Sequence, residues 1–574
     1  MIRNFALRRG WTILAIAVVV LGIIAVFLWW RYGRLVPIML AQDRERQALP
    51  KWTDGTNGII VATTGGYAVD AGLKVLREGG NACDAALTTE LAQTVHAAGA
   101  YVSFAGVMMA LYYEAQTGKV YSMDAGYNVP LEENDPLSIR PTNGRAVLVP
   151  GFMAGVQAYH DRFGKLPLSR LFEPSIALAE NGEPICGYLA WGIEANKAAL
   201  SRFPETKSVF TKPDGSFYGI HWFGGSDIFR QPALAQTLKA VAANGTTYMY
   251  EGAWARKFIE TVRNAGGKIT LEDMKRYRVI WDEPLQSTFH DCKVYGVGPS
   301  SLGGVILIEG LNLLELANLK SFGHWTNSPE SLFWFNQIAA CNSYLYFSPT
   351  IDGKLLSPKL RAKKETSAWI WSQMQARKWP TLTNTTLVAA SAAKHSAALV
   401  VVDRWGNVAV MTHSINSGPW GTGMFVDGVS VPSSAQPRVC KIVGPGNRQF
   451  ATPSPLLFMR DNKPVLACGA IGAGDCKTLQ VLENIFDFHM SLPAAEKAPA
   501  FLTPLFRHRQ LVAQFNHREF DSKVLDGLRS LGMKAEILDA NQQFGYWAGV
   551  QIDPETGRLS GAVSHGDCEQ VAGY

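Results

Sequence analysis

The chain has 574 residues, with 54 lysines and arginines against 48 aspartates and glutamates, and 47% of its residues are hydrophobic. This composition is too apolar for a disordered protein, and the length is ample for a large buried core. The formal net charge of +6 is small for this length, and no long basic run occurs, which argues against nucleic acid as a partner. The 54 glycines and 29 prolines follow no triplet period, so a collagen-like protein is excluded.

An uncharged apolar stretch near the N-terminus, residues 11–30, is long enough to cross a ~30 Å hydrocarbon core as a helix. It is longer than the apolar region of a cleaved signal peptide, and the flanking arginines slightly favour an N-terminus inside the cytoplasm. We expect a cytoplasmic segment at 1–10, a transmembrane signal-anchor at 11–30 and a polar linker at 31–57. The body would then lie in the periplasm or outside the cell, and a single span excludes a transporter.

The eight cysteines and 11 histidines show none of the spacings typical of a metal site. There is no C-x-x-C pair and no H-E-x-x-H motif, so zinc ribbons and thioredoxin-like chemistry are not indicated. An oxidising compartment would allow disulfides, but the sequence does not choose among the many pairings. We expect no metal and no cofactor.

The spacing of apolar residues predicts the helices and strands of the first half of the body. Residues 58–63 predict a strand, followed by a helix that Gly79 and Gly80 close, and a second helix begins near Asn81. Further helical patterns and one short strand follow in chain order. They are a helix–turn–helix over 151–182, helices over 232–245 and 254–267, a strand over 291–298, and a glycine-rich turn that opens an apolar helix up to residue 318.

Two hairpins are predicted in the second half. Residues 397–403 and 408–416 form almost continuous apolar strands around the turn 404–407, and residues 455–470 repeat the pattern with Asp461 and Asn462 at the tip. Strands that are apolar on both faces must be covered on both sides. With helices before and after them, they indicate a layered α/β sandwich.

Five segments, in a fixed order, resemble the gamma-glutamyltransferase family of N-terminal-nucleophile hydrolases. The terminal AGY (572–574) adds to them, and together they cover nearly everything after residue 57. The resemblance implies an α/β (α+β) fold, a four-layer αββα sandwich, and a precursor that cuts itself. The segments are GGNACDAA (79–86), VPGFMAGVQAYHDRFGKLPLSRLFEPSIALAENG (149–182), GPSSLGG (298–304), SAALVVVDRWGNVAVMTHSINSGPWGTG (396–423) and SPLLFMRDNKPVLACGAIGAGD (454–475).

In that family the cut creates a new N-terminal residue whose hydroxyl is the nucleophile and whose freed α-amine is the base. The match places Ser396 at this position, so the expected cut lies between His395 and Ser396. It would divide the body into a large-subunit part, 58–395, and a small-subunit part, 396–574, that remain associated. The family has threonine at the nucleophile position, and serine supplies the same hydroxyl without the β-methyl group.

The resemblance assigns roles to five further positions. Ser414 matches a second hydroxyl that hydrogen-bonds the nucleophile, and Asn416 matches the residue that contacts the α-amino group of the acyl donor. Gly472 and Ala473 match two glycines whose backbone N–H groups hold the oxyanion. At Ala473 the N–H keeps its direction only if φ is negative. Thr452 matches one of two hydroxyl residues that hold the donor carboxylate.

Three departures from the family concern the donor. Gly126 stands where the family has the arginine that binds the donor carboxylate, Ala451 replaces one of the two hydroxyl residues, and residues 429–436 contain no acid for the donor amine. Loss of an arginine–carboxylate pair alone costs roughly two decades of affinity. We therefore expect the γ-glutamyl group to be poorly held. Candidates for lining a less charged pocket are Tyr127, Asn128 and Trp420.

Two classes of function follow. The first is a self-processed amidohydrolase or acyltransferase that transfers the acyl group to water or to an acceptor amine or dipeptide. Its substrate would be a γ-glutamyl amide such as glutathione, or another small acyl amide such as a cephalosporin side chain. The second is an unprocessed relative that binds a ligand without catalysis. Two fragments under denaturing conditions would indicate the enzyme, and one uncut chain the binder.

Overall fold

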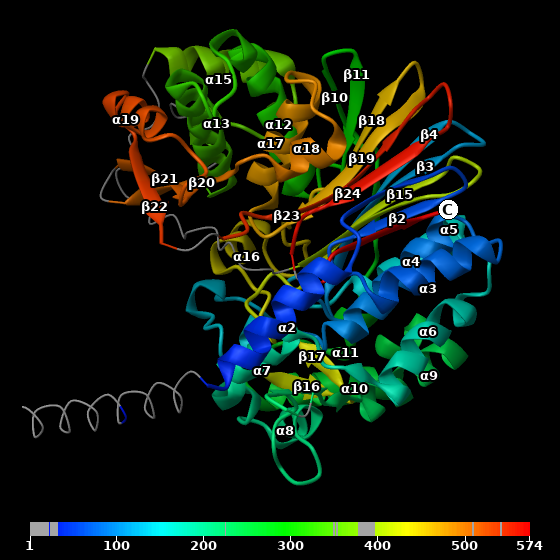
Figure 1. The fold of residues 1–574 in the computed structure, drawn as a ribbon. Coiled ribbons are helices and arrows are strands. Elements are labelled where there is room, and N and C mark those ends of the chain that lie inside the picture. Colours follow the sequence, from blue (N-terminus) through cyan, green and yellow to red (C-terminus); the bar gives the residue numbers. More distant parts are fainter. Residues whose placement is uncertain are drawn as a thin grey trace, which may run out of the picture.

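The computed structural model describes residue 22 and residues 33–574, apart from residues 224, 348–349, 352–353, 377–395, 508–509, 540–541 and 567. Two seven-stranded sheets lie face to face at its centre (Figure 1). Sheet I runs from edge to edge as β25 (Gln570–Gly573), β2 (Ile59–Ala62), β14 (Ser396–Val402), β15 (Val408–Ser414), β3 (Val107–Glu114), β4 (Lys119–Ala125) and β9 (Ile280–Asp282). Sheet II runs as β1 (Trp52–Gly55), β24 (Leu559–Val563), β23 (Tyr546–Ile552), β19 (Lys463–Ile471), β18 (Leu456–Arg460), β11 (Cys292–Gly296) and β10 (Leu285–Phe289).

Helices cover the outer face of each sheet, which gives the four αββα layers (Figure 1). Over sheet I lie α3 (Tyr67–Arg77), α4 (Ala82–His96), α5 (Phe152–Phe163), α6 (Leu168–Asn181), α9 (Pro232–Asn244) and α10 (Ala253–Asn264). Over sheet II lie α12 (Leu302–Ala317), α13 (Pro329–Phe347), α15 (Lys364–Gln375), α17 (Gly474–Phe486) and α18 (Leu492–Lys497).

The apolar strands are buried on both faces, as their sequence predicts. In β14, Leu399 and Val401 pack under the helices of sheet I, while Val400 and Val402 pack between the two sheets. The alternation follows from the two-residue period of a strand. Both predicted hairpins are confirmed, β14 with β15 and β18 with β19, and the second turns at left-handed Asp461 and Asn462.

The predicted helices of the first half are also confirmed. Asn81 caps α4, because its side chain accepts from the backbone N–H of Asp84 while the Asp84 side chain accepts from that of Asn81. Smaller elements complete the body. They are α7 (Gly187–Leu200), α8 (Pro204–Phe210), α11 (Leu271–Arg276), β16 (Met424–Val426), β17 (Val429–Val431), α14 (Pro358–Arg361), α16 (Pro437–Val443), β20 (Phe501–Arg507), β21 (Gln510–Asn516), α19 (Ser522–Ser530) and β22 (Lys534–Leu538).

The segment 31–57, expected as a polar linker, contains regular structure. Helix α2 (Leu35–Ala48) buries Pro37, Ile38 and Ala41, and its Glu45 side chain accepts from the backbone N–H of Gly187 at the start of α7. Strand β1 then joins the edge of sheet II. The polar residues of this segment lie on the exposed side of a packed helix, which a reading by overall polarity misses.

The expected single-pass membrane topology is corrected by the structure. In the part of the chain that the structure describes, no helix is both long and apolar enough to cross a membrane. The proposed cytoplasmic segment 1–10 and signal-anchor 11–30 lie outside the described residues, except for residue 22. The expectation rested on the length and apolar composition of residues 11–30 and on the flanking arginines. Apolar composition does not separate membrane spans from core helices, since α12 is apolar over most of its length and is buried within the helical layer over sheet II.

Candidate active site

Two hydroxyl groups meet where the first hairpin opens. Ser396 begins β14 and Ser414 ends β15, and the two residues are direct cross-strand partners. The Ser396 hydroxyl donates to the Ser414 oxygen over 2.9 Å. Both side chains lie on the face of sheet I that is turned towards sheet II, because they share the register of Val400 and Val410. Ser396 is half-buried and Ser414 is buried, so one hydroxyl is accessible and the other supports it.

Asn416 joins this pair through its backbone. Its N–H donates to the Ser414 oxygen over 3.0 Å, and its φ of 52° places it in the left-handed region that asparagine tolerates. The side-chain nitrogen Nδ2 of Asn416 is buried and has no hydrogen-bond partner in the described part of the chain. A buried donor without an acceptor is costly, so a ligand oxygen at this place would stabilise the site.

The predicted oxyanion donors follow β19 of the opposite sheet. A Cβ atom placed on Gly469 of β19 would lie 3.4 Å from both the Ala398 Cβ and the Thr412 Oγ1, so β19 packs closely on the hairpin two residues from Ser396 and Ser414. Gly472 and Ala473 come just after this contact. Gly472 has a φ of 72°, and Ala473 has a φ of −79° and caps α17. The negative φ of Ala473 fulfils the condition for an alanine at this position.

The start of α17 is electrostatically suited to an anion. The first N–H groups of a helix have no acceptor within it, and they carry a partial positive charge. Asp475, in the first turn, would oppose an oxyanion when ionised, and burial raises the pKa of its carboxyl group. This residue carries the nearest acidic group in sequence to Gly472 and Ala473, and sequence reasoning gave it no role.

Thr452 lies on the segment between β17 and β18 and is exposed, whereas its neighbour Ala451 is buried. The Ser301 hydroxyl and the Leu302 N–H, at the start of α12, both donate to the Ala451 carbonyl oxygen over 3.0 Å. Thr452 is not part of the hydrogen-bonded group around Ser396 within the residues described. His395, the other side of the expected cut, lies outside them.

Of the three residues expected to line a less charged pocket, two are core residues. The Tyr127 ring is buried, and its hydroxyl donates to the carbonyl oxygens of Ala105 and Ile415; Trp420 is buried and donates to the Ala98 carbonyl. The Asn128 oxygen accepts from Arg448, which also pairs with Asp124. The contacts of Arg448 with Asn128 and Asp124 were not identified from the sequence, because no local signal connects positions that are 320 or more residues apart.

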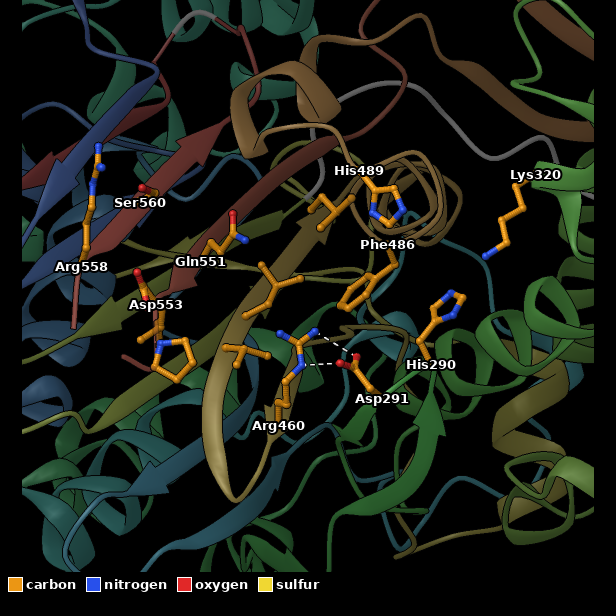
Figure 2. A pocket seen from close by; sticks show the side chains of 15 residues that line it. His290, Asp291, Lys320, Arg460, Phe486, His489, Gln551, Asp553, Arg558 and Ser560 are labelled. Atoms are coloured by element: carbon orange, nitrogen blue, oxygen red, sulfur yellow. Dashed lines mark hydrogen bonds and ion pairs between the residues drawn. The ribbon is translucent and has the colours of Figure 1, made fainter. Parts of the chain in front are cut away.

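A cavity of about 720 Å³ opens on the outer face of sheet II (Figure 2). Figure 2 shows Arg460 pointing to Asp291. Lys320 forms an ion pair with Asp487, and the His290 ring is hydrogen-bonded to the same carboxylate. Arg460 ends β18, at the hairpin end of β19, whereas Gly472 follows its other end. The nine residues of β19 span about 30 Å, so this cavity is remote from the two serines.

Comparison with known proteins agrees with this geometry. The family model described as Gamma-glutamyltranspeptidase matches residues 68–573. The glutathione hydrolase proenzyme of Bacillus subtilis is 27% identical over 546 residues, with 88% of this chain and 89% of the relative covered. The acylase ACY 1 proenzyme of Pseudomonas sp. strain SE83 is 27% identical, with 82% and 86% covered.

A solved structure supports the fold. The crystal structure of cephalosporin acylase from Bacillus halodurans superimposes with a TM-score of 0.76, at 21% identity, over 92% of this chain and 97% of that one. The family match covers six of the seven strands of each sheet, all but β1 and β2, and both serines of the hairpin. The chain therefore belongs to the gamma-glutamyltranspeptidase family and is an enzyme of the gamma-glutamyltransferase-like N-terminal-nucleophile hydrolase class.

Proposed function

We propose that this enzyme is a self-processed amidohydrolase or acyltransferase whose nucleophile is the hydroxyl of Ser396. The observation that carries the proposal is the 2.9 Å hydrogen bond between the hydroxyls of Ser396 and Ser414, at the first residue of a strand in the register that the family resemblance predicts. The proenzyme names of the relatives support a cut in the chain. The cut would separate a large part, 58–395, from a small part, 396–574.

The reaction would proceed in two steps. After the cut between His395 and Ser396, the freed α-amine of Ser396 takes the hydroxyl proton while the oxygen attacks the amide carbonyl of the donor. The N–H groups of Gly472 and Ala473 hold the oxyanion, which contributes several kcal/mol to such reactions. The amine leaves with the proton, and water or an acceptor amine then releases the acyl group from Ser396. Ser414 orients the nucleophile.

The donor would be an amide with a small acyl group. Relatives of similar identity are named glutathione hydrolase and acylase, so the names alone do not choose between γ-glutamyl and other acyl groups. The absence of a side chain at Gly126 favours a donor other than a γ-glutamyl amide. In the site, Asn416 Nδ2 offers a neutral donor to an oxygen of the acyl group, and Thr452 offers a hydroxyl at the exposed rim.

Intact mass and N-terminal sequencing of the purified chain test the proposal. We expect two associated fragments, the smaller starting at Ser396, and a single uncut chain for Ser396→Ala. Ser417→Ala is the matched control, because Ser417 lies three residues after Ser414 and, within the residues described, its hydroxyl donates only to the neighbouring Gly418 carbonyl. An uncut wild-type chain would refute the enzyme mechanism and would favour a non-catalytic binding protein.

A further inference from the structure

Position 126 lies on the same transverse row of sheet I as the two serines. Ser414 pairs with Val107 of β3, and Met108 pairs with Ala125 of β4, so Gly126 comes opposite Val107. Three strand spacings of about 4.8 Å separate Gly126 from Ser396, roughly 14 Å between backbones. An acyl chain on Ser396 and a long side chain reaching towards it from position 126 would together span this distance. An acyl chain that extends from Ser396 along this row would therefore end beside Gly126, and we call this end the far end of the acyl site.

That space is already filled. A Cβ atom on Gly126 would lie 2.8 Å from the Asp124 Oδ1, 3.0 Å from the Arg448 Cδ and 3.1 Å from the Met109 Cε. All three are tighter than normal contacts, so a side chain here requires its neighbours to move. Arg448, four residues before Thr452, thus occupies the space that a side chain at position 126 would fill.

The charge of Arg448 is neutralised within the protein. Its Nη1 donates to the Asp124 Oδ1 over 2.8 Å and to the Asp124 carbonyl over 3.1 Å, its Nε donates to the Asn128 Oδ1 over 2.8 Å, and its Nη2 donates to the Arg278 carbonyl over 2.7 Å. The guanidinium also lies 5.0 Å from the centre of the Tyr277 ring. The side chains of Arg448 and Asp124 are 9% and 1% exposed.

The surroundings of Arg448 hold its guanidinium in the charged form. Burial opposes the charge of Arg448, but Tyr277 and Asp124 outweigh it, and the net effect raises the pKa of the guanidinium. Most of its N–H groups are engaged by protein oxygens. A carboxylate of a ligand would have to compete with Asp124 for them, and would add a negative charge next to an existing one.

We propose that Arg448 and Asp124 set the donor specificity of this enzyme: the pair closes the far end of the acyl site as an electrically neutral wall. The substrate class is then amides whose acyl group carries no carboxylate at that end. This inference rests on the proposed function, because it requires acylation of Ser396. Arg448 contacts the donor end of the site rather than the reacting bond, so it is a specificity residue and not a catalytic one.

Two donors that differ in a single group measure this property. 4-Aminobutyryl-p-nitroanilide has the structure of γ-glutamyl-p-nitroanilide without its α-carboxylate, and both keep the amine. We expect kcat/KM of the processed enzyme to be at least tenfold higher for the donor that lacks the carboxylate. A ratio near one, or a preference for the γ-glutamyl donor, would overturn the inference.

Variants of the pair separate a charge effect from loss of structure. Asp124→Asn leaves the charge of Arg448 without its counter-ion, so the ratio should fall about tenfold in favour of the γ-glutamyl donor. Arg448→Gln leaves Asp124 negative and should raise the ratio, and the double variant should return it towards the wild-type value. Arg460→Gln, which breaks an arginine–aspartate pair in the remote cavity, is the matched control and should leave the ratio unchanged.

Results that refute the proposed function can be distinguished from results that refute the specificity inference. If neither donor acylates Ser396 in single-turnover mass measurements, or if Ser396→Ala has the same turnover, the nucleophile assignment is wrong. If both donors acylate Ser396 but the ratio is the same in all variants, the enzyme mechanism stands and the specificity inference is wrong. If one of the two single variants fails to fold, the other carries the test, because the ratio is expected to fall for Asp124→Asn and to rise for Arg448→Gln, and an unchanged ratio in either contradicts the inference.

Discussion

Removal of one partner from the buried ion pair between Arg361 and Glu309 should destabilise the protein strongly. The Arg361 Nε and Nη2 each donate over 2.8 Å to one oxygen of Glu309, and its Nη1 donates over 3.2 Å to the Leu345 carbonyl. The two side chains are 1% and 0% exposed. The pair ties α12 to α14, and the start of α12 holds the Ala451 carbonyl beside Thr452.

The size of the effect follows from burial. Arg361→Met leaves the Glu309 carboxylate in an apolar layer without a counter-ion, and such losses cost about 3–5 kcal/mol. Replacing both residues, as in Arg361→Met with Glu309→Leu, removes the charge problem, so the double variant should recover most of this loss. By contrast, Arg170 is 42% exposed in its ion pairs, and Arg170→Met should cost at most about 1 kcal/mol.

Denaturant unfolding in the Ser396→Ala background measures these differences on a single uncut chain. The midpoints of the four proteins are compared at equal slope, since a changed slope would signal a changed unfolding reaction. A cost for Arg361→Met no larger than that for Arg170→Met would refute the reasoning. So would a double variant as unstable as the single one, because the loss would then come from packing and not from an unpaired charge.

Three further predictions concern the site and its surroundings. Ser414→Ala removes the hydroxyl partner of the nucleophile and should slow acylation about tenfold, the worth of one hydrogen bond of about 1.4 kcal/mol, in single-turnover assays. Gly472→Ala places an alanine in the left-handed backbone conformation of Gly472, so it should lower the free energy of unfolding by about 1–2 kcal/mol and greatly reduce kcat. Ala473→Gly, at a position with negative φ, should keep kcat within a few-fold. Burial raises the pKa of Glu496, but Lys477, Ser564 and His565 outweigh it and lower it to about 2. Because this value lies below that of the unfolded chain, the stabilisation is complete above about pH 4.5 and is lost as the pH falls towards 2, and Glu496→Gln should flatten acid unfolding in that range.

The local elements were predictable because each has a local cause. The hairpin of β14 and β15 follows from strands that are apolar on both faces, and the start of α4 follows from the capping pair Asn81 and Asp84. The sheet order was not predictable in this way. Strand β25 pairs with β2, so that Gln570 lies opposite Ala62, and this depends on tertiary contacts between the two ends of the chain.

The same distinction explains which parts of the candidate site could be predicted. Ser396 and Ser414 are 18 residues apart on one hairpin, so their meeting follows from strand register alone. Alanine at position 473, where the family has glycine, keeps the direction of the backbone N–H only if φ is negative, and φ is negative in the structure. The engagement of Arg448 by Asp124 had no sequence signal, because the fold must bring the end of β4 and the loop between α16 and β18 together.

The two ends of the acyl site are therefore built under different constraints. The nucleophile end is fixed by the register of one hairpin, where a shift by one residue would turn Ser396 away from its partner. The donor end is built from the segments 124–128 and 447–452, which pair through a bridge between Asn128 and Arg448. A residue lost from one segment can be replaced in space by a residue from the other, as Arg448 fills the room beside Gly126. Membership of the family consequently supports the proposed chemistry at Ser396 more strongly than it supports any one donor, and donor preference must be measured on this chain.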